Sequence, residues 1–246
     1  MEIGRKYILK KQDQSITTYN IDSNTMKLDN RCFEYCSNLS SIMLGNSIIS
    51  LGDYCFRYCS NLSSIRLPDS IKRLGNYCFH GCSNLKSIVF GNSIVSLNIH
   101  CFQDCSNLST IKLPDSIQYL DNHCFYKCYN LNSITLGNSV TSLGDSCFHD
   151  CSNLSTITLP NSVQHLGNRC FEYCNNLSSI TLGNSVTSLG NNCFKYCYNL
   201  TSITLPSSIQ HLGIDCFGCC SNLTSIILPE NKLYLIHSKL GISMNN

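Results

Sequence analysis

The chain has 246 residues, a net charge of +2 and only 13% charged residues. These values argue against a protein that holds nucleic acid or a membrane surface by electrostatics. The N-terminal segment MEIGRKYILKKQDQ has no apolar core long enough for a signal peptide, and no later apolar run is long enough to span a membrane. We therefore expect a cytoplasmic protein with no nucleic-acid partner and no membrane insertion.

The dominant feature of the sequence is a 23-residue period that recurs nine times without insertion. Each copy begins with Cys-Phe, at Cys32, Cys55, Cys78, Cys101, Cys124, Cys147, Cys170, Cys193 and Cys216. An unbroken period of this length indicates a solenoid, in which each repeat buries its apolar face only against its neighbours. Since no linker interrupts the period, we predict one elongated domain of nine repeats over residues 32–231.

The two ends of the chain are predicted to cap this stack. Shifting the repeat back by one period places Ile16, Tyr19, Ile21, Met26 and Leu28 on or beside apolar columns. Residues 1–31 therefore read as a degenerate terminal repeat with a polar outer side, as a solenoid end requires. Residues 232–246 are predicted to form a C-terminal cap and a polar tail. Association of molecules end to end remains open.

Within one repeat the spacing of apolar residues predicts three segments. Residues 61–67 carry the inward alternation Ile65-x-Leu67 of a short strand. A turn and a second extended segment follow over 68–74. Gly75 then lets the chain change direction, and residues 76–82 are predicted to make one turn of helix that buries Phe79 and Cys82.

The residue that follows the first strand alternates between repeats, which makes the larger unit 46 residues long. Glycine occupies this position at Gly45, Gly91, Gly137 and Gly183, and proline occupies it at Pro68, Pro114, Pro160 and Pro206. Proline cannot donate a backbone hydrogen bond, so the column is expected at a strand end. The ninth repeat breaks the alternation with Pro229.

The pattern CFxxCxNLxxIxLPxSIxxLG resembles the BspA-like class of leucine-rich repeat, whose usual form is AFxxCxxLxxIxLPxxVxxIG. The match covers residues 32–231, with Cys in place of the usual Ala and with Gly replacing Pro in alternate repeats. The resemblance implies a leucine-rich-repeat solenoid, a right-handed curved stack with a parallel β-sheet on its concave face and short helical turns and strands on its convex side. It also implies protein recognition or adhesion as the usual function.

Cysteine is abundant, with 19 residues, and 18 of them fall in two repeat columns. We interpret the columns as reduced core thiols, because a free cysteine packs as a small hydrophobe. Some disulfides or a metal site are the alternatives, although zinc requires four convergent ligands that a ladder supplies at no particular place. Cys219 lies outside the columns and is the cysteine expected to be exposed.

Asparagine fills one further column in all nine repeats: Asn38, Asn61, Asn84, Asn107, Asn130, Asn153, Asn176, Asn199 and Asn222. We predict that these amides bond backbone groups of their own and the adjacent coil, which would satisfy buried polar atoms.

The outward positions of the first strand are the predicted binding surface, because a solenoid sheet presents them as rows on one extended face. The predicted partner-binding row is Met43, Arg66, Val89, Lys112, Thr135, Thr158, Thr181 and Thr204. Its first half is variable and partly basic, and its second half is a uniform series of hydroxyls. The simpler interpretation is that Ser and Thr are soluble strand formers with no ligand.

The sequence predicts no catalytic residue, no cofactor and no metal ligand, because no phosphate-binding loop, zinc motif or local nucleophile signature occurs. We interpret the chain as a non-enzymatic protein-interaction scaffold that binds an unknown protein partner through the sheet face. Two alternatives stay open: a cell-surface adhesin, and a metal or redox store that uses the cysteine columns.

Overall fold

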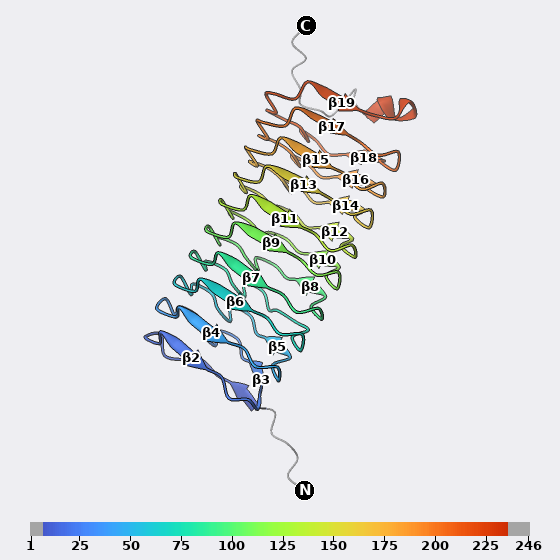
Figure 1. The fold of residues 1–246 in the computed structure, drawn as a ribbon. Coiled ribbons are helices and arrows are strands. Elements are labelled where there is room, and N and C mark those ends of the chain that lie inside the picture. Colours follow the sequence, from blue (N-terminus) through green and yellow to red (C-terminus); the bar gives the residue numbers. More distant parts are fainter. Residues whose placement is uncertain (1–6, 236–246) are drawn as a thin grey trace.

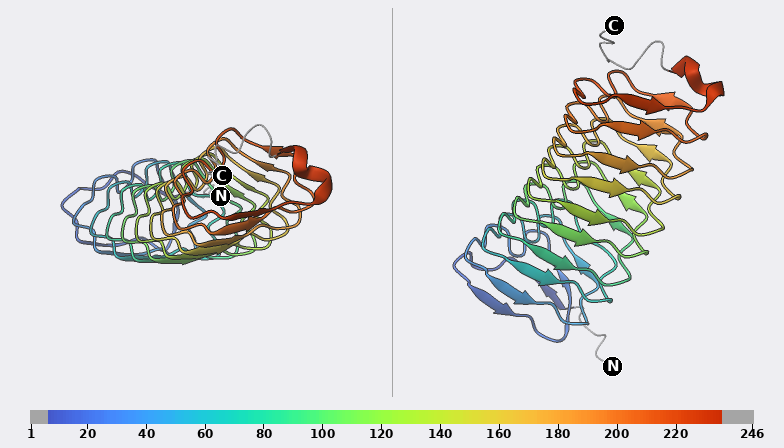
Figure 2. Two further views of the ribbon diagram at one scale, coloured as in Figure 1. Left: turned by 90° about the horizontal axis from the view of Figure 1, so that it is seen from above. Right: turned by 45° about the horizontal axis from the view of Figure 1, so that its top comes forward.

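The computed structural model describes residues 7–235, which form one long stack of parallel coils (Figure 1). All strand pairs are parallel, and the two ends of the chain lie at opposite ends of the stack. Viewed along the stack, successive repeats overlie one another (Figure 2). The fold is thus a parallel β-solenoid, as the period predicted, and it agrees with the leucine-rich-repeat type that the resemblance implied.

One face of the stack carries the longer strands, and we call it the long-strand face. Each of these strands has three residues, of which the middle one is buried and the outer two are exposed in the eight strands β4 to β17 that belong to this face. This pattern is the period-two alternation of a half-buried strand. The strands are β2 (Thr18–Asn20), β4 (Ser41–Met43), β6 (Ser64–Arg66), β7 (Ser87–Val89), β9 (Thr110–Lys112), β11 (Ser133–Thr135), β13 (Thr156–Thr158), β15 (Ser179–Thr181), β17 (Ser202–Thr204) and β19 (Ser225–Ile227).

The second extended segment of each repeat builds the opposite, short-strand face. Its inward leucines are buried, and its strands pair into a continuous six-stranded sheet from β8 to β18. A three-stranded sheet at the N-terminal end joins β1, β3 and β5, and an isolated bridge links Ser50 to Arg73. The strands are β1 (Tyr7–Leu9), β3 (Thr25–Leu28), β5 (Ser50–Leu51), β8 (Ser96–Leu97), β10 (Tyr119–Leu120), β12 (Ser142–Leu143), β14 (His165–Leu166), β16 (Ser188–Leu189) and β18 (His211–Leu212).

The long-strand face is not one continuous sheet. Its strands are hydrogen-bonded only in pairs, β2–β4, β6–β7, β9–β11, β13–β15 and β17–β19. Each open boundary follows a repeat of the glycine type, and we call these four boundaries (β4/β6, β7/β9, β11/β13 and β15/β17) seams. The 46-residue alternation predicted from the sequence therefore corresponds to a physical unit of two repeats. The pair β17–β19 bonds although Pro229 stands in the glycine position, so glycine is not a condition of pairing.

The turn of helix predicted for residues 76–82 is not formed, and a series of reverse turns takes its place. Tyr77 and Gly81 have φ angles of 56° and 71°, in the left-handed region, which stops a right-handed helix from continuing. The N–H groups of Tyr77, Phe79 and Gly81 donate to carbonyls of the next repeat at 2.8–2.9 Å. Those of His80 and Cys82 donate backwards within the turn, at 3.1–3.2 Å. The turns thus form a third backbone ladder along the stack. We call them the turn segments.

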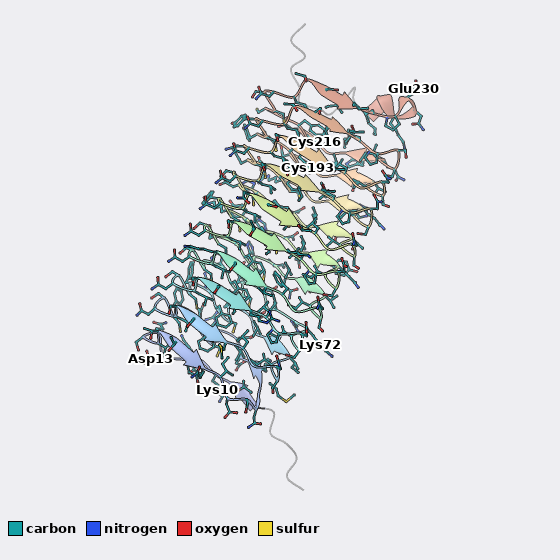
Figure 3. All side chains as sticks on the ribbon, viewed as in Figure 1. Lys10, Asp13, Lys72, Cys193, Cys216 and Glu230 are labelled. Carbon is teal, nitrogen blue, oxygen red and sulfur yellow. The ribbon has the colours of Figure 1, made fainter. Side chains whose placement is uncertain are left out.

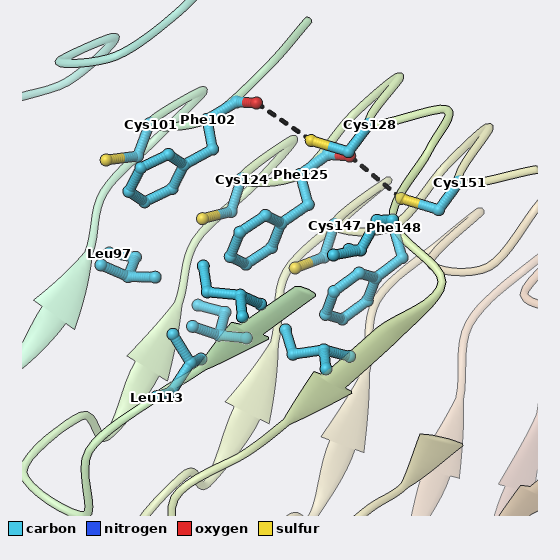
Figure 4. Packing of buried hydrophobic residues seen from close by; sticks show 14 of the residues in the cluster. Leu97, Cys101, Phe102, Leu113, Cys124, Phe125, Cys128, Cys147, Phe148 and Cys151 are labelled. Atoms are coloured by element: carbon cyan, nitrogen blue, oxygen red, sulfur yellow. Dashed lines mark hydrogen bonds between the residues drawn. The ribbon is translucent and has the colours of Figure 1, made fainter. Parts of the chain in front are cut away.

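The core is a set of columns rather than a cluster around one centre. The nine Phe side chains of the Cys-Phe column are fully buried, and neighbouring rings stack nearly parallel, as Phe102, Phe125 and Phe148 do in Figure 4. The second cysteine column lies beside them. Cys128 and Cys151 donate their thiol hydrogens to the carbonyl oxygens of Phe102 and Phe125, at 3.2 and 3.1 Å. Burial of each repeat therefore depends on the repeats on either side of it.

The N-terminal segment continues the repeat geometry. Thr18 and Asn20 pair with Ser41 and Met43 in the register of the later repeats, and the Tyr19 ring meets Phe33 edge-on at 5.3 Å. Leu28 is fully buried. We propose residues 1–31 as the capping segment and residues 32–231 as the nine repeats.

At the other end a 3-10 helix, η1 (Glu230–Leu235), stands where the earlier repeats have their short strand, and Glu230 projects from it (Figure 3). Residues 236–246 of the predicted tail lie outside the described residues.

Candidate binding face

The predicted partner-binding residues lie in one row on the long-strand face. Each is the last residue of its strand and is exposed, and Met43 and Val89 expose 77% and 49% of their surface. Arg66 is the registered neighbour of Val89, and Lys112 that of Thr135, in parallel ladders. The structure therefore brings residues from eight separate repeats onto one surface: Met43, Arg66, Val89, Lys112, Thr135, Thr158, Thr181 and Thr204.

The cationic half of this row has no acidic partner in the described part of the chain. All ion pairs found among residues 7–235 join side chains of the turn segments, for example Arg57 with Glu34 at 3.3 Å. Arg66, Lys112 and Lys86, which directly precedes β7, take part in none of them. Exposed cations without local carboxylates are available to a ligand of opposite charge.

The hydroxyl half of the row contains shallow depressions at two seams. One, of about 360 Å³, lies between β11 and β13, and the other, of about 330 Å³, lies between β15 and β17. Thr135 and Thr158 line the first, and Thr181 and Thr204 line the second. These linings contain hydroxyl, amide and aliphatic groups but no charged side chain, so they contrast with the cationic half.

The asparagine column forms a ladder, but its bonds differ from the prediction. The amide of Asn130 donates to Asn107 at 3.2 Å and accepts from Asn153 at 3.1 Å, and similar bonds link Asn61 to Asn84 and run on to Asn199. The side chains bond one another across repeats instead of bonding the backbone, and almost all of the column is exposed. A fixed column at equal spacing was the signal for the ladder.

The turn segments hold a network of aromatic and charged residues that sequence reasoning recognised only in part. Tyr35 and Tyr58 stack at 5.2 Å, Tyr173 and Tyr196 stack at 4.4 Å, and the Arg57 guanidinium lies 4.8 Å from the Tyr58 ring. The sequence places Tyr35, Tyr58, Tyr173 and Tyr196 at the same position of the repeat, so these tyrosines could be found from the period. The sequence does not show which histidines lie between neighbouring rings.

Two histidines of this network, the buried His80 and the partly buried His149, are held in the neutral form. Burial lowers the pKa of His80 to about 4, opposed by nearby Asp104. Burial also lowers the pKa of His149 to about 4, and the positive charge of Arg169 adds to the effect. Glu172 faces His149, with Oε2 3.3 Å from Nδ1, and burial raises the pKa of this carboxyl group. These groups pack the edge of the stack and lie away from the long-strand face.

The cysteine columns are buried and unpaired, as predicted. Cys219 is exposed and Cys220 is half-buried, whereas the other 17 thiols are buried. Burial raises the pKa of Cys82 and of Cys220 to about 12, so these thiols stay protonated at neutral pH. The thiolate is the form that ligates metal and attacks electrophiles. The protonated thiols of the columns are therefore expected to do neither at neutral pH. Among residues 7–235, no group of three or more His, Cys, Asp or Glu residues is placed to hold a metal ion.

A search for membrane-spanning helices found none in the described residues.

Comparison with protein families gives a match to the BspA type leucine rich repeat region, in six copies that cover residues 5–132 and 118–239. No curated protein matches the chain.

Solved structures of three bacterial proteins are similar in fold. A leucine-rich repeat protein from Bacteroides ovatus is 23% identical with a TM-score of 0.55, over 88% of this chain and 74% of that one. A leucine rich cell surface protein from Faecalibacterium prausnitzii is 21% identical with a TM-score of 0.63, over 86% and 69%. The pneumococcal vaccine antigen PcpA is 18% identical with a TM-score of 0.56, over 92% and 66%.

Proposed function

The chain belongs to the BspA-type leucine-rich repeat family, and from that premise we propose that it is a non-enzymatic scaffold that binds a protein partner through its long-strand face. Binding is centred on Met43, Arg66, Val89 and Lys112 and extends over Thr135, Thr158, Thr181 and Thr204. The observation that carries this proposal is the exposed cationic and apolar half of the row, which has no carboxylate of its own within ion-pair distance among the described residues.

The chemistry of this surface suits a protein ligand. Covering exposed apolar side chains such as Met43 with a partner lowers the free energy of the complex. Exposed cations steer an acidic partner and fix its register, although each exposed ion pair adds only about 0.2–1 kcal/mol. Affinity would therefore come from several modest contacts along the stack.

The test compares two pairs of substitutions in the same row. Arg66→Ala with Lys112→Ala should weaken capture of the partner from an extract of the cells that make the protein. Thr158→Ala with Thr204→Ala is the matched control and should weaken it much less. Equal losses, or no loss from the first pair, would refute this placement of the site.

A second candidate function is adhesion at a cell surface, which the neighbours' names favour. One structural neighbour is called a cell surface protein and another a vaccine antigen. Antibody staining of intact cells separates the candidates: surface staining supports the adhesin, and staining only after permeabilisation supports a scaffold in the cytoplasm.

A further inference from the structure

The spacing between repeats in the phenylalanine column matches the pitch of an α-helix. Neighbouring Phe rings are nearly parallel, and their centroids are 5.2–5.5 Å apart along the whole column, from Phe33 to Phe217. An α-helix rises about 5.4 Å per turn. A helix that lies along the stack therefore advances by one turn for every repeat it crosses.

The cationic half of the row presents a matching periodic pattern. Met43, Arg66, Val89 and Lys112 follow one another in consecutive repeats, so apolar and cationic side chains alternate along the stack axis. Lys86, which directly precedes β7, adds a third positive charge near the beginning of this strand. No carboxylate of the described chain lies within ion-pair distance of these three cations.

We propose that the occupant of this surface is an acidic amphipathic α-helix of a protein partner, lying along the stack axis. Residues i, i+4, i+7 and i+11 of a helix lie on one face, one per turn. The helix places apolar residues at i and i+7 against Met43 and Val89. It places Asp or Glu at i+4 and i+11 against Arg66 and Lys112. This inference rests on the proposed function, to which it adds the chemistry and geometry of the partner.

An extended partner fits the same surface less well. Residues on one face of a strand repeat about every 6.6 Å, and this distance falls out of step with the repeats after two or three intervals. Strand addition would also need space beside a strand edge, whereas β6, β7 and β9 each have a neighbouring strand on both sides, hydrogen-bonded on one side and across a seam on the other. The four contact repeats span about 16 Å, which is the length of roughly 11 helical residues.

The test uses a synthetic alanine-based peptide of about 16 residues, long enough to form a helix when bound. It carries Leu at i and i+7 and Glu at i+4 and i+11. A control peptide of the same composition has both Glu residues moved to the opposite face, and a second control has Pro at its centre. Binding to the full chain is followed by fluorescence anisotropy, and helix formation by circular dichroism.

We expect the patterned peptide to bind about tenfold more tightly than either control and to gain helicity on binding. Arg66→Glu with Lys112→Glu should reduce its affinity about tenfold, and a peptide with Lys in place of Glu should recover binding to that variant. Gln164→Glu with Gln210→Glu, at exposed positions of the short-strand face, is the matched protein control and should leave the affinity unchanged.

The inference is overturned if the patterned peptide does not bind or if the face-shifted peptide binds equally well. Equal binding of the Pro peptide would identify an extended acidic segment instead. If the peptide fails while capture of the native partner still depends on Arg66 and Lys112, the helical partner is wrong and the proposed function stands. If capture is also independent of both residues, the proposed site fails with it.

Discussion

Gly91 stands so close to the carbonyl oxygen of Pro68 that a β-carbon placed on it would lie 2.5 Å from that oxygen. Gly45 occupies the same column, but a β-carbon there would meet nothing within 4 Å, because no proline repeat precedes it. The two glycines therefore have the same sequence context and opposite tolerance for a side chain.

We expect Gly91→Ala to lower the free energy of unfolding by about 1–3 kcal/mol, since backbone must move to accommodate the methyl group. Gly45→Ala should be neutral to within about 0.5 kcal/mol. Urea denaturation followed by circular dichroism measures both. Equal effects would show that the close approach does not constrain this column.

The backbone amides of the leucines that follow the long strands should exchange with solvent at two different rates. Leu113 and Leu159 donate across a bonded pair, to Thr135 and Thr181 at 2.9 Å. Leu136 and Leu182 face seams and donate to no backbone carbonyl of the described part of the chain. All four side chains are buried, so they form a matched set. Hydrogen exchange followed by NMR should show the seam amides exchanging at least about tenfold faster. Uniform protection would mean that the seams close in solution.

The cysteines should react in two classes. In the native protein a thiol reagent should label Cys219 rapidly and the buried columns slowly, because buried thiols are inaccessible and remain protonated. After denaturation all 19 should react. Cys219→Ser should abolish the rapid phase. Far fewer than 19 thiols in the denatured, unreduced protein would show that disulfides form.

Acidification should destabilise the fold through its buried histidines. The pKa of His149 is about 4 in the folded chain and 6.5 for an ordinary histidine, so the unfolded chain takes up a proton that the folded chain does not. The stabilisation is complete above about pH 6.5 and is lost as the pH falls toward 4. We expect a loss of roughly 1–2 kcal/mol per buried histidine, after allowance for partial solvent screening.

Urea titrations at pH 7 and pH 5 test this expectation. His149→Gln should flatten the dependence of stability on pH in this range. The charged neighbours of His149, which are Glu172, Arg169 and Lys127, are unchanged in this variant, so a difference in pH dependence can be assigned to His149. An unchanged slope for His149→Gln would contradict the assignment.

The left-handed turn positions should tolerate Asn better than a β-branched residue. Lys127 has a φ angle of 60°, and its N–H donates to the His149 carbonyl at 2.9 Å, which holds it there. Asn occupies this region more readily than other residues, and β-branched side chains do so least. Lys127→Asn should be neutral or slightly stabilising, and Lys127→Val should cost about 1–2 kcal/mol by thermal or urea unfolding. Equal stability of the two variants would count against strain at this position.

The fold could be predicted from the sequence because its information is periodic. Ile65 and its equivalents fix the strand and its inward face, and the 23-residue period places each row of outward residues. The solenoid and the row of eight candidate residues follow from these two facts alone. The solenoid and the row both depend only on how the repeats stack in register. They could therefore be predicted without knowing any particular side-chain contact.

The turns could not be predicted in the same way. Left-handed φ angles are usually signalled by glycine, but here they occur at Tyr54, Tyr58, Lys127 and Arg169 among others. Among residues 7–235, glycine provides only one of them, Gly81. Hydrogen bonds to the next repeat impose this conformation, and they exist only when the coils are stacked. The seams were hidden for a similar reason: the Gly/Pro alternation indicated a two-repeat unit without showing which boundary opens.

The seams also affect how the stack can bend. Behind the seams β7/β9, β11/β13 and β15/β17 the sheet from β8 to β18 runs unbroken, and behind β4/β6 the isolated bridge between Ser50 and Arg73 joins the two repeats. The strand pairs of the long-strand face are therefore linked to one another through the short-strand face. A ligand that covers the surface from Met43 to Lys112 would cross two seams and would hold three strand pairs at a fixed distance from one another. Binding at this surface would therefore stiffen the N-terminal part of the molecule against bending. Binding would in this way be linked to the flexibility of the whole stack.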